Sequence, residues 1–96
     1  MDRCTRKDAE AQFSRLITVM GGRVAKDYKD VGAYRLDWNS TYGGGNIERI
    51  VSDTGGVSQP FGHTRKGARE FCEMCRFAIY TLTELRTNIK CGGIYA

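Results

Sequence analysis

The sequence lacks any long hydrophobic run, and this absence excludes several classes of protein. No stretch approaches the roughly 18 uncharged apolar residues that a membrane span requires. The opening residues, MDRCTRKDAEAQF, contain no apolar run typical of a signal peptide. We therefore expect a cytoplasmic protein with no membrane partner.

Residues for the common catalytic chemistries are also scarce. His63 is the only histidine, and no serine or cysteine can be paired with it from sequence. No pair of carboxylates indicates acid–base catalysis. The glycine-rich segments STYGGG and TGG match no phosphate-loop spacing. We therefore expect a protein that is not an enzyme and that needs no cofactor.

What the chain does contain is enough apolar material for one small core. Its 96 residues are 41% hydrophobic, with ten aromatic side chains and a single proline. This composition is globular, and it predicts a single small domain over residues 1–96. The net charge of +4 is mildly basic, which suits a nucleic-acid partner without requiring one.

Periodicity predicts the order helix, three strands, helix. Apolar residues recur at helical spacing in residues 6–20 and 65–86, and strand-like patterns occupy 33–39, 46–53 and 57–61. The simplest assembly is a two-layer α+β fold of order α-β-β-β-α. In it, the N-terminal helix and the long C-terminal helix pack on one face of a three-stranded antiparallel sheet.

Local signals place the ends of both helices. Thr5 and Asp8 form a capping-box pattern, and Gly21 and Gly22 follow the first helix. Thr64 is the expected cap of the last helix. Residues 87–96 are rich in turn formers and are expected to form a flexible tail.

The segment FCEMCRFAIY carries a C-x-x-C pair within the last helix. At 100° per residue, Cys72 and Cys75 fall in the middle of the apolar stripe, where cysteine packs as a small hydrophobe. We therefore expect no metal ligand here. The alternative is a zinc-stabilised interaction domain in which Cys4 and Cys91 complete a four-thiolate site.

The opposite side of the same helix carries unexpected apolar residues. Met74, Phe77 and Tyr80 lie away from the stripe and are the predicted partner-binding residues. A host protein or ribonucleoprotein complex is the expected partner, with a homodimer through the C-terminal helix as a further expectation. The competing interpretation is that the first helix or the tail covers these side chains.

A basic flank runs beside them. Arg65, Lys66, Arg69 and Arg76 are the predicted nucleic-acid contacts. Arg65, Arg69 and Arg76 follow one flank of the predicted helix, and Lys66 adds positive charge at its N-terminus. The alternative is an ordinary solvated face on which Glu73 pairs with a neighbouring arginine.

The motif T-R-K-G-A-R, residues 64–69, together with the order of elements, resembles the double-stranded RNA-binding domain. That family opens its second helix with a Ser/Thr-Lys-Lys-x-Ala-Lys type of motif that grips phosphates. The resemblance implies phosphate contacts at Arg65, Lys66 and Arg69. The loop STYGGG departs from the family, because it lacks the Gly-Pro-x-His segment.

A second resemblance covers residues 34–86. Y-G-G-G-N-I-E-R-I (42–50), G-G-V-S (55–58) and R-K-G-A-R-E-F (65–71) are similar to small uncharacterised proteins of phages and prophages. This resemblance implies a phage accessory protein in the cytoplasm of a bacterial host. Such proteins often bind and inhibit host machinery, anti-CRISPR proteins among them. A direct nucleic-acid binder is the alternative.

Overall fold

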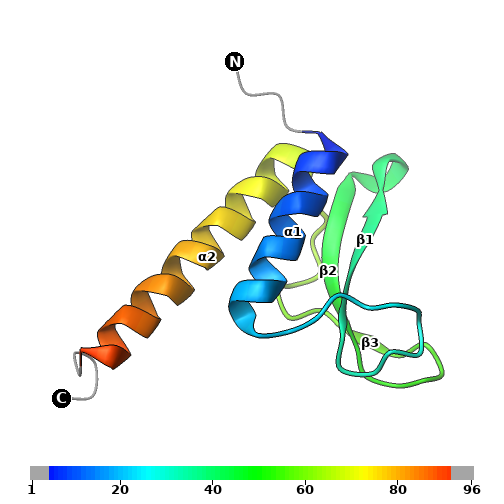
Figure 1. Cartoon of the computed structure of the whole chain (residues 1–96). Helices are drawn as coiled ribbons and strands as arrows, with labels where there is room; N and C mark the ends of the chain where they lie inside the picture. Colours follow the sequence, from blue (N-terminus) through cyan, green and yellow to red (C-terminus); the bar gives the residue numbers. More distant parts are fainter. Residues whose placement is uncertain (1–4, 92–96) are drawn as a thin grey trace.

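The computed structural model describes residues 5–91 and has the order α-β-β-β-α. Its elements are α1 (Arg6–Met20), β1 (Tyr34–Asn39), the short 3-10 helix η1 (Ser40–Tyr42), β2 (Gly44–Ile50), β3 (Val57–Ser58) and α2 (Ala68–Lys90). The strands form one antiparallel sheet in the order β1-β2-β3, and both helices lie on one of its faces (Figure 1). The predicted α+β fold is confirmed.

Helix α1 has the ends that the sequence predicts. The backbone N–H of Thr5 donates to the Asp8 carboxylate at 2.9 Å, and the Asp8 N–H donates to the Thr5 hydroxyl at 3.3 Å. This capping box satisfies amide groups that have no partner within the helix. Gly21 ends the helix in the left-handed region, with φ of 80°.

Strand β2 begins two residues earlier than predicted, at Gly44, so that Gly44 and Gly45 of the STYGGG segment lie within the strand. A Cβ on Gly45 would lie 2.4 Å from the Trp38 ring, and one on Gly44 would lie 2.1 Å from the Lys66 carbonyl oxygen. The glycines are therefore close-approach positions within the sheet.

The prediction for the start of α2 is wrong. The helix begins at Ala68 with Gly67 as its cap, not at residue 65 with Thr64 as cap. The reason is that Lys66 pairs with β2: its N–H donates to Gly45 O at 2.9 Å, and its carbonyl accepts from Gly45 N at 2.8 Å. A residue held in this extended bridge cannot be helical.

Two further boundaries differ from expectation. Strand β3 contains two residues rather than five, because Pro60 lies in a turn closed by the Gly62 N–H on Gln59 O at 3.0 Å. Helix α2 continues to Lys90, so residues 87–90 of the expected tail are helical. Cys91 caps the helix, and the remaining residues of that predicted tail, 92–96, lie outside the described residues.

The core lies between the helices and the inner face of the sheet. Trp38 from β1 and Phe71 from α2 meet edge to face, with ring centroids 6.1 Å apart. The cluster of buried side chains consists of Ala9, Phe13, Leu16, Ile17, Tyr34, Ile47, Phe71, Cys72, Cys75 and Ile79.

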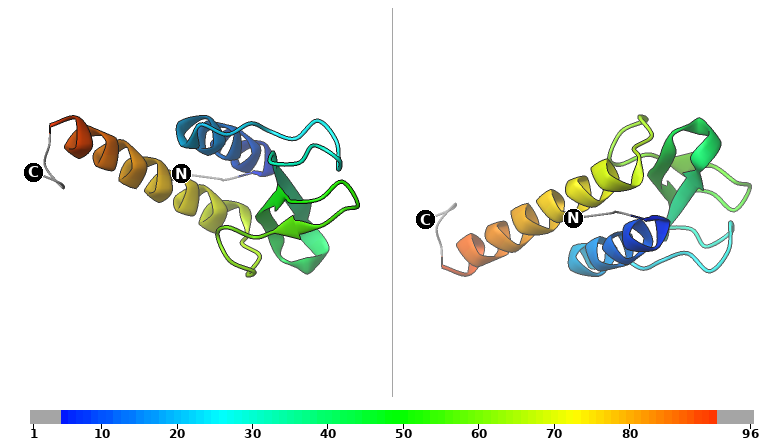
Figure 2. Two further views of the ribbon diagram at one scale, coloured as in Figure 1. Left: turned by 90° about the horizontal axis from the view of Figure 1, so that it is seen from below. Right: turned by 90° about the horizontal axis from the view of Figure 1, so that it is seen from above.

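Helix α2 extends well past the sheet, as both views of Figure 2 show. Ile79 is its last buried residue, and the helix continues for about three turns beyond it. The Arg86 guanidinium donates to the carbonyl of Val19 near the end of α1, so the two helices remain connected there. Within residues 5–91, no helix is long and apolar enough to cross a membrane.

Candidate partner-binding surface on α2

The buried face of α2 fixes which side chains point outward. Phe71, Cys72 and Cys75 are each 0% exposed, and Ile79 is 9% exposed. These four residues follow helical spacing along one stripe, so residues on the opposite side of the helix must face solvent. The prediction that both thiols turn inward is confirmed.

Two aromatic rings occupy that opposite side. Phe77 is 75% exposed and Tyr80 is 79% exposed. The first helix does not cover them, because α1 packs on the buried stripe instead. The prediction that these rings point away from the core is therefore confirmed.

Phe77 lies at the rim of an apolar groove of about 400 Å³. The groove is lined by side chains from α2, the end of α1 and the loop after β3, namely Met20, Phe61, Met74, Phe77, Ala78, Thr81 and Leu82. We call it the outer groove. It brings the predicted residues Met74 and Phe77 together.

Tyr80 lies on the other side of Thr81 and does not line the outer groove. It borders a shallower depression lined by Tyr80, Thr81, Glu84, Leu85 and Asn88. Thr81 belongs to both linings, so the two depressions adjoin each other on α2. We refer to the outer groove and this depression together as the outer surface of α2.

Sequence reasoning missed several members of this surface. Met20 and Phe61 come from other elements, and only the tertiary fold brings them to α2. Leu85 is 37% exposed and lines the depression beside Tyr80. It lies three residues after Leu82, and this apolar spacing beyond the end of the core was present in the sequence.

The basic flank is not one continuous stripe. Arg65 precedes α2 and lies over the sheet, where its guanidinium pairs with the Asp37 carboxylate at 2.5 Å. It also donates to the carbonyls of Asp37 at 3.2 Å and Gly44 at 3.1 Å. Its predicted place on the helix flank is therefore wrong. The side chain is 28% exposed and connects the loop to the sheet.

Of the other three basic residues, Arg69 and Arg76 are exposed and Lys66 is partly buried. Arg69 is 77% exposed and lies 3.4 Å from Glu73, one turn along the helix. Arg76 is exposed, and no hydrogen bond or ion pair joins it to another described residue. The Lys66 ammonium donates to the Thr64 carbonyl at 3.3 Å. Arg69 and Arg76 lie on one flank of α2, as expected.

The cysteines show features of core residues. Burial, with a smaller effect from Cys72, raises the pKa of the Cys75 thiol to about 12. A thiol with this pKa remains protonated at neutral pH, whereas metal ligation and nucleophilic attack need the thiolate. The raised pKa of Cys75 therefore favours a packing role over metal ligation or nucleophilic attack.

The proposed four-thiolate set also conflicts with the length of α2. Cys91 caps the far end of the helix, 16 residues after Cys75, which corresponds to about 24 Å along the axis. One zinc ion cannot bridge that separation, because Zn–S bonds are about 2.3 Å long. Cys4 lies outside the described residues, among which no group of three or more potential ligands converges.

Comparisons with known proteins identified no relative of this sequence. No family model matches the sequence, and searches of curated proteins and of solved structures found no match.

Proposed function

We propose that this protein is a non-catalytic binding protein that docks a partner protein on the outer surface of α2. The supporting observation is the exposure of two aromatic rings, Phe77 at 75% and Tyr80 at 79%, beside an apolar groove of about 400 Å³. Aromatic rings are enriched at the energetic centres of protein interfaces. These two rings contribute little to the core of the protein, so a bound partner can bury their apolar surface.

The chemistry of the groove indicates what the partner presents. Polar atoms contribute almost nothing to its lining. The expected partner therefore inserts apolar side chains, either from a helix or from a protruding loop. Two of the lining residues, Met20 and Met74, have flexible thioether side chains that adapt to different shapes.

The charges around the rings are of both signs. Arg69 and Arg76 lie on one flank of α2, whereas Glu73 and Glu84 lie nearer its outermost line. Exposed charges around an apolar centre contribute more to orientation and association rate than to affinity. We therefore assign affinity to the rings and the groove, and orientation to the charged rim.

The resemblance to small phage proteins indicates which partner to test first. We propose a bacterial host protein, or the protein surface of a defence ribonucleoprotein complex, with inhibition as the consequence of docking. The nucleic-acid alternative has less support, because Arg65 is paired with Asp37 and Arg69 with Glu73. Phosphate contacts at these positions require existing pairs to break.

The proposal is tested by capture from a nuclease-treated bacterial lysate on immobilised protein. Three forms are compared: the unchanged protein, the double variant Phe77→Asp, Tyr80→Asp, and the control Tyr42→Asp. Tyr42 is 72% exposed but belongs to η1, away from α2. We expect the same proteins to be captured by the unchanged chain and the control, and to be lost from the double variant.

Two results would contradict this proposal. One is capture that the double variant leaves intact, since the rings would then play no part. The other is a homodimer, measured by light scattering, that the double variant dissociates while no foreign protein is captured. A gel-shift titration with duplex RNA at low salt completes the test, and we expect no salt-dependent shift.

A further inference from the structure

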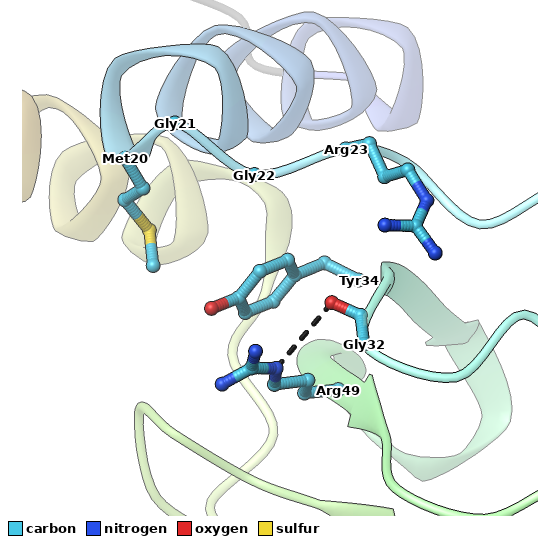
Figure 3. Close-up of a pocket in the computed structure, with 7 residues that line it drawn as sticks. All are labelled: Met20, Gly21, Gly22, Arg23, Gly32, Tyr34 and Arg49. Carbon is cyan, nitrogen blue, oxygen red and sulfur yellow. Dashed lines mark hydrogen bonds between the residues drawn. The ribbon is translucent and has the colours of Figure 1, made fainter.

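A second pocket lies on the other side of the α1 C-terminus, about 360 Å³ in volume. Figure 3 shows the residues that line it: Met20, Gly21, Gly22, Arg23, Gly32, Tyr34 and Arg49. Its volume is at the lower end of the range for small-molecule sites. Neither the outer-surface rings nor any predicted site residue belongs to this pocket.

Tyr34 places a hydroxyl group in this pocket without a partner. The side chain is only 9% exposed, and its hydroxyl makes no hydrogen bond to any residue from 5 to 91. The ring is fixed from above by Gly22, where a Cβ would lie 2.8 Å from ring atom Cε1. The hydroxyl is accessible from the pocket rather than sealed in the core, so its O–H group can donate to a ligand there.

Arg49 lies directly beside that hydroxyl (Figure 3). The strand register pairs it with Tyr34, and its guanidinium carbon lies 5.4 Å from the Tyr34 ring centroid. Its Nε atom donates to Gly32 O at 3.4 Å, which orients the group. The two terminal nitrogens have no partner among the described residues, so their N–H groups are available to a ligand.

The surrounding charges favour an anion with a single negative charge. Arg23 is already paired with Asp30 at 2.5 Å, so Arg49 is the uncompensated cation of the pocket. The C-terminal end of α1 adds partial negative charge, which opposes a doubly charged anion such as phosphate. A carboxylate has one charge and matches the planar fork of a guanidinium.

We propose that this pocket binds a carboxylate through the Arg49 guanidinium and the Tyr34 hydroxyl, with Met20 contacting a short apolar body attached to it. The carboxylate is carried either by a small organic acid or by the free C-terminus of a peptide. The Tyr34 hydroxyl lies between the Met20 side chain and the Arg49 guanidinium (Figure 3). Of the residues that line this pocket, Met20 also lines the outer groove, whereas Tyr34 and Arg49 do not.

The test is a titration of the full chain, followed by the backbone amide signals of Gly21, Gly22 and Gly32. The probes are butyrate and its neutral isostere butyramide, at constant ionic strength. N-acetyl-leucine and its amide form a second pair that represents a peptide terminus. We expect saturable shifts with a carboxylate and none with the amides. Stronger binding of N-acetyl-leucine than of butyrate indicates a peptide terminus, and the reverse order indicates an organic acid.

Variants separate binding at this site from general effects of salt. Tyr34→Phe keeps the ring and removes the hydroxyl, and we expect about tenfold weaker binding, since a hydrogen bond to a charged group is lost. Arg49→Gln should abolish the saturable shifts, while the α2 variant Phe77→Asp, Tyr80→Asp should bind butyrate normally. Equal binding of butyramide, unchanged binding by Arg49→Gln, or tighter binding of inorganic phosphate than of either carboxylate would overturn the assignment.

Discussion

Phe71 and Phe77 are both phenylalanines of α2 and lie six positions apart, yet Phe71 is 0% exposed and Phe77 is 75% exposed. Six residues correspond to about 600°, which places the two rings on different sides of α2. Phe71 packs on Trp38 within the core, whereas Phe77 borders the outer groove. Helical phase, rather than residue type, therefore separates the side chains that hold the fold from those available for binding.

Arginine shows the same division. Arg65 makes an ion pair and two hydrogen bonds to the sheet, and 28% of its side chain is exposed. Arg76 lies on the solvated flank of α2. Both were predicted to contact nucleic acid, but Arg65 connects a loop to the sheet, whereas Arg76 remains exposed to solvent.

The largest expected effect is that of Phe71→Ala. It removes a fully buried ring, and we expect a loss of about 3–5 kcal/mol in the free energy of unfolding. Phe77→Ala is the matched control, and its expected change is within about 0.5 kcal/mol. Urea denaturation of both variants measures this difference in the free energy of unfolding. Similar losses in the two variants would contradict the assignment of Phe71 to the core and Phe77 to the surface.

Arg65→Ala is expected to cost about 2 kcal/mol, because the Asp37 carboxylate and two carbonyl oxygens lose a charged donor. Arg76→Ala should change the free energy of unfolding by less than about 0.5 kcal/mol. The same denaturation experiment measures both. A neutral Arg65→Ala would show that the contacts to the sheet do not stabilise the fold.

Cysteine extends the comparison to pH. The pKa of Cys75 is about 12 in the fold against 9.0 for an ordinary thiol, so the unfolded chain loses the proton first. This contribution is fully present below pH 9 and is lost as pH rises toward 12. Between pH 8 and pH 10 we expect the thiol to account for a loss on the order of 1 kcal/mol in the free energy of unfolding.

The matched variants are Cys75→Ala and Cys91→Ala. The first should lack this part of the pH dependence, whereas the second should retain it, because Cys91 is exposed at the end of α2. Urea denaturation at both pH values provides the measurement. Equal pH dependence in the two variants would show that burial of Cys75 is not responsible.

The sequence was sufficient for features that depend on local periodicity. The order of elements, the ends of α1 and the two faces of α2 all follow from spacing and capping residues. The start of α2 could not be predicted in the same way, because it is set by the bridge between Lys66 and Gly45, which are 21 residues apart. The role of Arg65 was missed for the same reason.

The candidate site was likewise predictable only where its residues lie on one element. Periodicity was enough to predict Met74, Phe77 and Tyr80 as outward-facing candidates, because they share one helix. Residues brought in from other elements, Met20 and Phe61, depend on how the loop after β3 crosses the end of the core. The pairing of Tyr34 with Arg49 likewise requires the register of β1 and β2, which alternation within each strand does not specify.

The central claim is that Phe77 and Tyr80 are not required for folding and are available to a partner. The most direct test is the free energy of unfolding of the double variant Phe77→Asp, Tyr80→Asp, measured by urea denaturation at pH 7. We predict a value within about 1 kcal/mol of that of the unchanged protein, since substitutions at exposed positions have small effects. A loss of about 3 kcal/mol or more would place both rings in the core and contradict the proposed binding surface.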